Sequence, residues 1–188
     1  KNNVLKKYVS LLNKEKKSIL KANAKDREFA ERKRLKNNLI DRLSIDQEKL
    51  NNIGNSINKI IKLKDPIDNT LKKWIRPNGL KISKVSIPIG VIGVIYESRP
   101  NVTSDVAALC FKSGNPVILK GGSEAYFSNK ILSDLFKKAL RKNKVNSNYV
   151  QFIESKERKV VDILLSKMIG YIDLIIPRGG KGLVKKVQ

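Results

Sequence analysis

The stretch that most constrains the fold runs from Lys84 to Glu124. Two apolar runs, Ile89–Tyr96 and Pro116–Leu119, are joined by a short amphipathic segment, and each run ends abruptly in polar and turn residues. An apolar strand, a polar break, a short helix and a second apolar strand describe one parallel βαβ unit. Ligands of open parallel sheets bind at the carboxyl ends of the strands, so we expect the functional site at these two breaks.

The same alternation continues along the rest of the chain. Val150–Ile153 and Tyr171–Ile176 predict two more strands, each preceded by a segment with helical spacing. Residues up to about Lys64 contain no proline and are helical in character. The expected fold class is α/β, with N-terminal helices packed on a doubly wound, Rossmann-like parallel sheet. The expected division is a helical segment over 1–78 and a Rossmann-like domain over 79–188.

Several local features follow from the same pattern. Ser44 and Gln47 have the spacing of a capping box at a helix start. The proline-containing segment 65–78 is predicted to be a connector, followed by an extended edge segment. Ser155 is a candidate cap for the helix before the fourth strand. Cys110 falls on the buried stripe of the crossover helix, which favours a small core residue over an exposed nucleophile.

The net charge of +23 arises from 40 Lys and Arg against 17 Asp and Glu. Such an excess is typical of polyanion binding, and a basic nucleic-acid-binding module is one hypothesis for the chain. Only nine of the 40 are Arg, however, and Lys is accompanied by abundant Asn and Ile. Sites that read bases or clamp phosphates rely on Arg, so compositional bias with affinity for small phosphorylated ligands is the preferred interpretation.

The chain has one cysteine and no histidine. An intramolecular disulfide, a classical zinc site and Ser-His-Asp chemistry are therefore excluded for these residues alone, and no metal site is predicted. No apolar run approaches the roughly 20 residues of a membrane span, so no membrane association is expected and the cytoplasm is the default compartment.

Three polar strand ends are candidate ligand contacts. Pro177–Gly182, PRGGKG, could bring bare amides to a phosphate, but its spacing matches no established fingerprint and an ordinary βα turn is the alternative. Lys120 could contact a ribose hydroxyl or a 2′-phosphate, with Ser123 and Glu124 adding polar contacts, or it could simply be solvated. Asn101 could direct its amide at a developing oxyanion or could cap the following helix.

Longer blocks carry a family resemblance. GVIGVIYESRPNVTSDVAALCFKSGNPVILKGGSEA, from Gly90 to Ala125, resembles the signature region of gamma-glutamyl phosphate reductases, within the aldehyde dehydrogenase superfamily. The flanking segments LKANAKD, WIRPNGLKISKVSIPIG and YIDLIIPRGGKGLV are similar to the same family. Because the blocks are long and unusual and together span nearly the whole chain, chance similarity is a poor explanation.

The resemblance implies an activity. Such an enzyme reduces L-glutamyl 5-phosphate with NADPH to glutamate 5-semialdehyde and phosphate in proline biosynthesis. A cysteine thiolate displaces phosphate to form a thioester, which is then reduced. The fold implied is aldehyde-dehydrogenase-like, and residues 79–188 would be a truncated NADP-binding domain.

The resemblance also implies roles for particular residues. Asn101 matches the amide that stabilises the oxyanion. The cofactor contacts implied are Lys120 for the ribose and 2′-phosphate and two neighbouring loops, comprising Gly121, Gly122, Ser123 and Glu124 after the second strand and Arg178, Gly179 and Gly180 after the fourth.

One departure from the family pattern limits this prediction. The family's nucleophilic cysteine lies in a later catalytic domain, beyond the PRGGKG loop, and Cys110 is not in its motif. We therefore expect an incomplete enzyme that lacks its catalytic domain and is inactive alone, with a cofactor-binding module without catalysis as a further alternative. The partners implied are L-glutamyl 5-phosphate and further copies in a homo-oligomer, with coupling to the upstream glutamate kinase left open. No nucleic-acid partner is expected.

Overall fold

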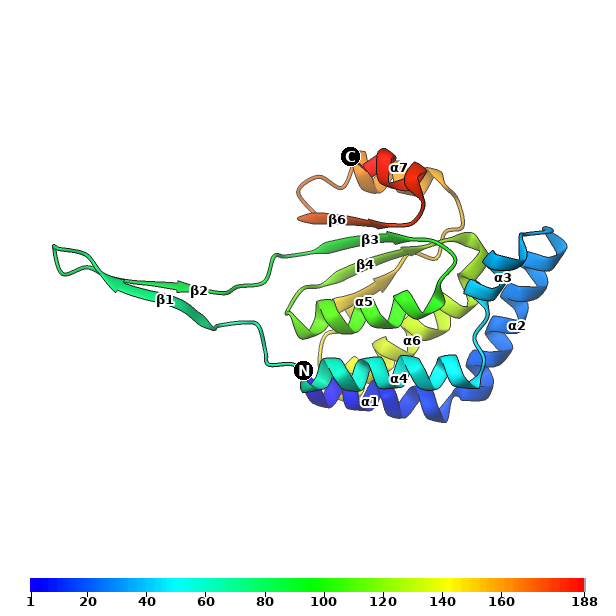
Figure 1. The fold of residues 1–188 in the computed structure, drawn as a ribbon, viewed down its shortest axis with the longest axis horizontal. Coiled ribbons are helices and arrows are strands. Elements are labelled where there is room, and N and C mark those ends of the chain that lie inside the picture. The colour runs from blue at the N-terminus through cyan, green and yellow to red at the C-terminus, as the bar shows by residue number, and fades with distance from the viewer. Residues whose placement is uncertain (188) are drawn as a thin grey trace.

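A computed structural model describes residues 1–187 (Figure 1). Most of the chain forms helices and strands, joined by short loops. The helices are α1 (Asn2–Lys14), α2 (Lys16–Arg32), α3 (Asn37–Leu43), α4 (Gln47–Lys62), α5 (Pro100–Lys112), α6 (Tyr126–Lys142), α7 (Lys159–Ser166) and α8 (Lys181–Val187). The strands are β1 (Thr70–Ile75), β2 (Lys81–Val85), β3 (Ile92–Tyr96), β4 (Val117–Gly121), β5 (Val150–Phe152) and β6 (Leu174–Arg178).

Four strands form a parallel sheet in the order β5-β4-β3-β6. β3 lies between β4 and β6 and is buried along its whole length, which explains its continuous apolar sequence. Helices α5 and α6 lie on one side of the sheet, with α1 and α4 beyond them, while α7 and α8 lie on the other side (Figure 1). The prediction of an α/β fold with helices on both faces of a parallel sheet is confirmed.

The N-terminal helices are held to the sheet layer by a buried polar contact within the apolar core. The Tyr8 hydroxyl on α1 lies 2.7 Å from the Ser104 hydroxyl on α5 and donates to the Leu132 carbonyl on α6 at 3.2 Å. The Tyr8 ring also packs on Phe136, with 4.6 Å between ring centroids. One side chain therefore connects three helices that are distant in sequence.

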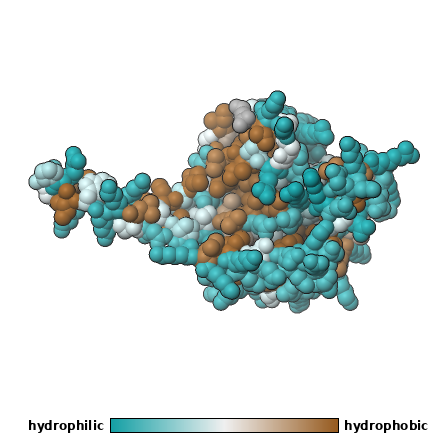
Figure 2. Space-filling view, viewed as in Figure 1, coloured by the Kyte–Doolittle hydropathy of each residue, from teal (hydrophilic) through white to brown (hydrophobic). Residues whose placement is uncertain are grey.

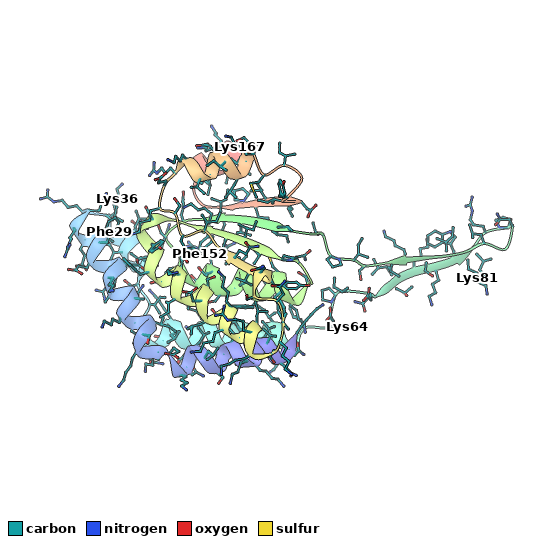
Figure 3. All side chains as sticks on the ribbon, turned by 180° about the vertical axis from the view of Figure 1, so that it is seen from behind. Phe29, Lys36, Lys64, Lys81, Phe152 and Lys167 are labelled. Atoms are coloured by element: carbon teal, nitrogen blue, oxygen red, sulfur yellow. The ribbon has the colours of Figure 1, made fainter. Side chains whose placement is uncertain are left out.

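The segment predicted as a connector is instead half of a hairpin. β1 and β2 pair antiparallel and project from the body as an arm, with Lys64 beside the body and Lys81 far out on the arm (Figure 3). The turn is closed by Gly79, whose φ of +83° favours glycine. Every residue of β1 is exposed, so the strand lacks the alternating burial on which recognition of a half-buried strand depends. The predicted division at residue 78 falls within this turn and stays a prediction.

Two predicted helix caps are wrong. The side chain of Asp46, not Ser44, caps α4 and accepts from the Lys49 amide at 2.7 Å. The Ser44 hydroxyl instead donates to the carbonyl of Ile40 in the preceding helix. Ser155 also does not cap α7, which begins at Lys159, because its hydroxyl accepts from an amide two residues later. Sequence spacing alone does not predict these caps, because each serine hydroxyl forms a hydrogen bond with nearby backbone instead of with the helix end.

Apolar side chains are exposed over and beside β6 (Figure 2). They come from the edge strand itself and from the segment before it, namely Ile163, Ile169, Tyr171, Leu174 and Ile176. Among the described residues, no helix is both long and apolar enough to cross a membrane.

Candidate functional site

A cavity of about 510 Å³ opens at the carboxyl ends of β3 and β4. We call it the strand-end cavity. The predicted contacts Lys120, Gly121, Gly122, Ser123 and Glu124 all line it. Other lining residues come from the loop after β3, from the loop before α7 and from α8, including Glu97, Ser98, Lys156, Arg158 and Lys186. With Leu35 and Leu39, which also line it, the cavity brings together residues from five segments that are separated in sequence.

Lys120 is the most buried cation of this cavity, with 5% of its surface exposed. Its ammonium donates to the Gly121 carbonyl at 2.9 Å, which fixes the end of the side chain beside the loop. Desolvation lowers the pKa of Lys120, and the nearby Glu124 carboxylate opposes this shift. A cation held in place and partly desolvated is well suited to an anionic ligand, because the ligand would recover the electrostatic stabilisation lost on burial.

The two glycines after Lys120 leave no room for side chains. A Cβ atom at Gly121 would lie 2.2 Å from the Asn129 amide nitrogen, and one at Gly122 would lie 2.3 Å from a Glu124 carboxylate oxygen. The backbone is therefore bare where it borders the cavity. Bare backbone allows close approach of a phosphate or sugar, which larger residues would prevent.

Glu124 ties the loop after β4 to the loop after β3. Its Oε1 accepts from the Ser98 amide at 2.9 Å and from the Ser98 hydroxyl at 2.7 Å. Ser98 has a φ of +34°, an uncommon conformation for a residue with a side chain. The two hydrogen bonds hold this backbone in place, and they leave the second carboxylate oxygen of Glu124 for a hydroxyl donor.

The glycine loop after β6 contacts the same region through Glu97. The Gly180 amide donates to Glu97 Oε2 at 3.0 Å, and a Cβ atom at Gly179 would lie 2.7 Å from that carboxyl group. Arg178 is different, because its side chain lines a separate cavity between α4 and α5. Of the three predicted cofactor residues after β6, Gly179 and Gly180 therefore lie beside the strand-end cavity, whereas Arg178 lies away from it.

Asn101 lies in the first turn of α5 and lines a further cavity of about 450 Å³. Its amide donates to Asp105 Oδ2 at 3.2 Å. The alternative that Asn101 caps this helix is wrong, because Arg99 is the N-cap residue and no side chain caps the end. Pro100 at the first helical position needs no amide partner, which reduces the need for such a cap. The oxyanion role of Asn101 stays a prediction.

Sequence reasoning missed Lys156. Its ammonium lies 4.6 Å from the ring centroid of Tyr126 and 4.9 Å from that of Phe127, and it lines the strand-end cavity. These rings begin α6, so the contact holds the loop after β5 against the helix that follows β4. The only available signal was position, because Lys156 follows shortly after a strand's carboxyl end.

Cys110 is buried in α5, as predicted for a core residue. Burial raises the pKa of its thiol to about 11, so it is protonated and unreactive at neutral pH. Among the described residues, no group of three or more carboxylate or thiol side chains is arranged to hold a metal ion.

The donor set of the strand-end cavity suits a phosphorylated ligand with hydroxyl groups. Lys120 and the exposed cations at the rim favour anions, while Glu124 offers an acceptor for a hydroxyl group. The two glycines after β4 let a nucleotide come close to the backbone of this loop. The residues present therefore fit a dinucleotide.

The curated proteins that this chain resembles share one name. It is 48% identical over 188 residues to the gamma-glutamyl phosphate reductase of Nitratiruptor sp., and 48% identical over 169 residues to that of Caldanaerobacter subterraneus. It covers 45% and 41% of those proteins, so it spans less than half the length of the curated relatives it matches. No protein-family model matches the chain.

Solved structures agree with these relatives. The gamma-glutamyl phosphate reductase of Thermotoga maritima matches 99% of this chain with a TM-score of 0.94 and 39% identity, and 45% of that protein is covered. The protein of the same name from Saccharomyces cerevisiae has a TM-score of 0.90 at 31% identity, with 99% of this chain and 47% of that protein covered. A benzaldehyde dehydrogenase from Corynebacterium glutamicum matches 99% of this chain and 37% of its own length, with a TM-score of 0.72. At 15% identity it shows only that the fold is shared.

Proposed function

Because this chain belongs to the gamma-glutamyl phosphate reductase family, we propose that it forms the dinucleotide-binding part of an NADP-dependent acyl-phosphate reductase. The reaction would be reduction of L-glutamyl 5-phosphate to glutamate 5-semialdehyde with release of phosphate, in proline biosynthesis. The observation that carries the proposal is the strand-end cavity, where five consecutive residues implied by the resemblance meet in one space.

The chain's own residues would bind and orient NADPH, which supplies a hydride when bound. Lys120 would contact the adenosine ribose and its 2′-phosphate, because its ammonium is the buried cation of the cavity. Gly121 and Gly122 would let the ribose approach the backbone, and Glu124 would accept from a ribose hydroxyl. The Gly179–Gly180 turn, already within reach of Glu97, would border the same ligand.

Asn101 would act at the reacting carbonyl as an oxyanion donor. Its amide now donates to Asp105, so this hydrogen bond would have to be exchanged for one to the substrate. Cys110 does not suit the thioester chemistry of the family, because it is buried with a raised pKa. The thiolate would therefore come from a cysteine outside these 188 residues.

We further propose that the working protein is a cytoplasmic homo-oligomer. The support for self-association comes from the β1–β2 hairpin, which projects from the body as an arm (Figure 1) and exposes Leu71, Trp74 and Ile75. Exposed strands with apolar side chains are suited to pairing with another copy. Coupling to the upstream glutamate kinase belongs to the same proposal.

A binding experiment tests the cofactor role. Lys120→Met keeps the length of the side chain and removes its charge, and Lys81→Met removes the same charge from the exposed hairpin as a matched control. We expect Lys120→Met to weaken NADPH binding by about tenfold or more, because a charge-assisted hydrogen bond contributes roughly 1.5–3 kcal/mol. NADH affinity should fall less, since NADH lacks the 2′-phosphate.

Titration calorimetry of both nucleotides with both variants separates the outcomes. An unchanged ratio of NADPH to NADH affinity in Lys120→Met would remove the 2′-phosphate role from Lys120. Absence of NADPH binding to the wild-type chain would count against the strand-end cavity as the cofactor site.

A further inference from the structure

Helices α4 and α5 enclose a second region with an unusual charge arrangement. Two adjoining cavities, of about 450 and 370 Å³, lie there, and both are lined by Ser56 and Asp105. We call these two cavities together the helix groove. Asn101 lines the larger of the two, so the groove borders the residue proposed to act at the reacting carbonyl.

Asp105 is an incompletely paired carboxylate in this groove. Its Oδ2 accepts from the Asn101 amide, whereas its Oδ1 is buried and accepts no hydrogen bond within the described part of the chain. Desolvation raises the pKa of Asp105, against the hydrogen bond from Asn101 and the charge of Arg178, which lower it. A buried polar atom without a partner is costly and uncommon, so it requires an explanation. The hydrogen bond from Asn101, one turn earlier on the same helix, accounts for Oδ2 of Asp105 but leaves Oδ1 without a partner.

Three cationic side chains line the same cavity as this carboxylate and form no ion pair with it. Arg42, Lys49 and Arg99 line the larger cavity. The Lys49 ammonium donates to two backbone carbonyls, those of Asp41 and Ser44. Arg42 and Arg99 are exposed, and neither forms an ion pair with another described residue. The larger cavity is therefore lined by two carboxylates, those of Asp41 and Asp105, and by the two unpaired guanidinium groups.

We propose that the helix groove binds the amino-acid end of the glutamyl substrate, with Asp105 accepting from its α-ammonium group and Arg99 donating to its α-carboxylate. This inference rests on the proposed function and deepens it by assigning the groups that recognise a glutamyl chain. An α-amino acid presents an ammonium and a carboxylate on one carbon, and it needs a carboxylate and a planar donor close together. Arg99 and Asn101 flank Pro100 at the start of α5. The residue proposed to donate to the α-carboxylate and the residue proposed to donate to the oxyanion are therefore neighbours in the chain.

The test compares two small ligands that differ in one group. L-glutamate carries the α-ammonium, whereas glutarate has the same carbon chain and both carboxylates without it. We expect the wild-type chain to bind L-glutamate at least tenfold more tightly than glutarate in titration calorimetry. Asp105→Asn should remove this preference by weakening L-glutamate about ten- to a hundredfold, with little change for glutarate.

Control variants keep the result interpretable. Glu48→Gln removes an equal charge from α4 at a position that lines neither cavity, so it should keep the preference. Arg99→Gln should weaken L-glutamate and glutarate alike, because both carry the carboxylate it binds. Thermal unfolding of each variant shows whether it is folded, and the exposed Arg99 serves as the test if Asp105→Asn fails to fold.

Some outcomes would overturn the inference. Equal affinity of the wild-type chain for the two ligands, or a preference that persists in Asp105→Asn, would do so, and unchanged binding in Arg99→Gln would remove the carboxylate assignment. NADPH titration of the same samples separates the two proposals. Loss of the L-glutamate preference with intact NADPH binding concerns the helix groove alone, whereas failure of NADPH to bind concerns the proposed function.

Discussion

At the scale of single residues, Gly121 shows how closely the loop after β4 and the core are joined. A Cβ atom there would lie 2.2 Å from the Asn129 amide and 3.2 Å from the Tyr96 ring. Asn129 is itself held by a hydrogen bond from Thr103, and Thr103 lies 2.7 Å from the Tyr96 hydroxyl. The loop that borders the cavity is thus packed against a buried polar network.

We predict that Gly121→Ala lowers the free energy of unfolding by about 1–3 kcal/mol, the usual cost of overpacking a core site. NADPH binding should weaken as well, because the loop must move. Gly182→Ala is the matched control, since nothing lies within 4 Å of its added Cβ and α8 should gain a few tenths of a kcal/mol to about 1 kcal/mol. Urea unfolding measures both variants, and equal stability of Gly121→Ala and wild type would contradict the proposed crowding.

The sequence identified part of the strand-end cavity and missed its long-range contacts. Lys120 to Glu124 could be predicted because they directly follow an apolar strand, and strand ends gather at one edge of a parallel sheet. The hydrogen bond from Gly180 to Glu97 joins residues 83 apart, and no local pattern reports such a contact. Neither does the sequence show that the Arg178 side chain points toward α4 and α5 rather than toward the glycine loop.

At the scale of elements, the β1–β2 hairpin was the least predictable part. The buried strand β3 was recognisable from its continuous apolar run, although the predicted start at Ile89 precedes the observed start at Ile92. β1 is exposed on both faces and mixes Leu71 and Trp74 with lysines, so it lacks both the continuous and the alternating pattern. Pairing with β2, rather than burial, makes it a strand.

We predict that the hairpin drives self-association but contributes little to the stability of the body. Residues 70–85 can be replaced by an Asn-Gly turn, because Asn69 and Ser86 already pair at 3.0 Å at its base. The free energy of unfolding should change by less than about 1 kcal/mol, since the removed residues are nearly all exposed. Light scattering should show a fall in molecular mass to that of a monomer.

A second hairpin variant isolates the cause. Leu71→Ser combined with Ile75→Ser keeps the arm and removes two exposed apolar side chains, so it should weaken association without shortening the chain. An unchanged mass after complete removal of the hairpin would show that other surfaces hold the copies together.

At the scale of the whole molecule, the excess of positive charge opposes folding. With 40 basic and 17 acidic residues, most lysines have no acidic partner, and the compact state brings like charges together. We predict that raising NaCl from about 20 mM to about 300 mM increases Tm by roughly 2–5 °C, because screening weakens this repulsion. Differential scanning calorimetry measures the shift, and KCl at equal ionic strength should give the same value. A lower Tm in salt would mean that surface ion pairs outweigh the repulsion.

The parallel sheet layer as a whole could be predicted, because alternating strand and helix signals leave few alternatives once connections are right-handed. The place of the N-terminal helices was harder to foresee. Their apolar faces predict burial, but only the structure shows that the Tyr8 hydroxyl contacts α5 and α6.

The contact made by Tyr8 has a consequence for synthesis on the ribosome. Its hydroxyl meets Leu132, which is added 124 residues later. At about 5–20 residues per second, α1 would wait roughly 6–25 seconds before its partner helix exists. During that time the amphipathic face of α1 could pack only on elements made before α6, such as α4, or bind a chaperone. The order of synthesis therefore leaves the apolar face of α1 open to aggregation until α6 has been made.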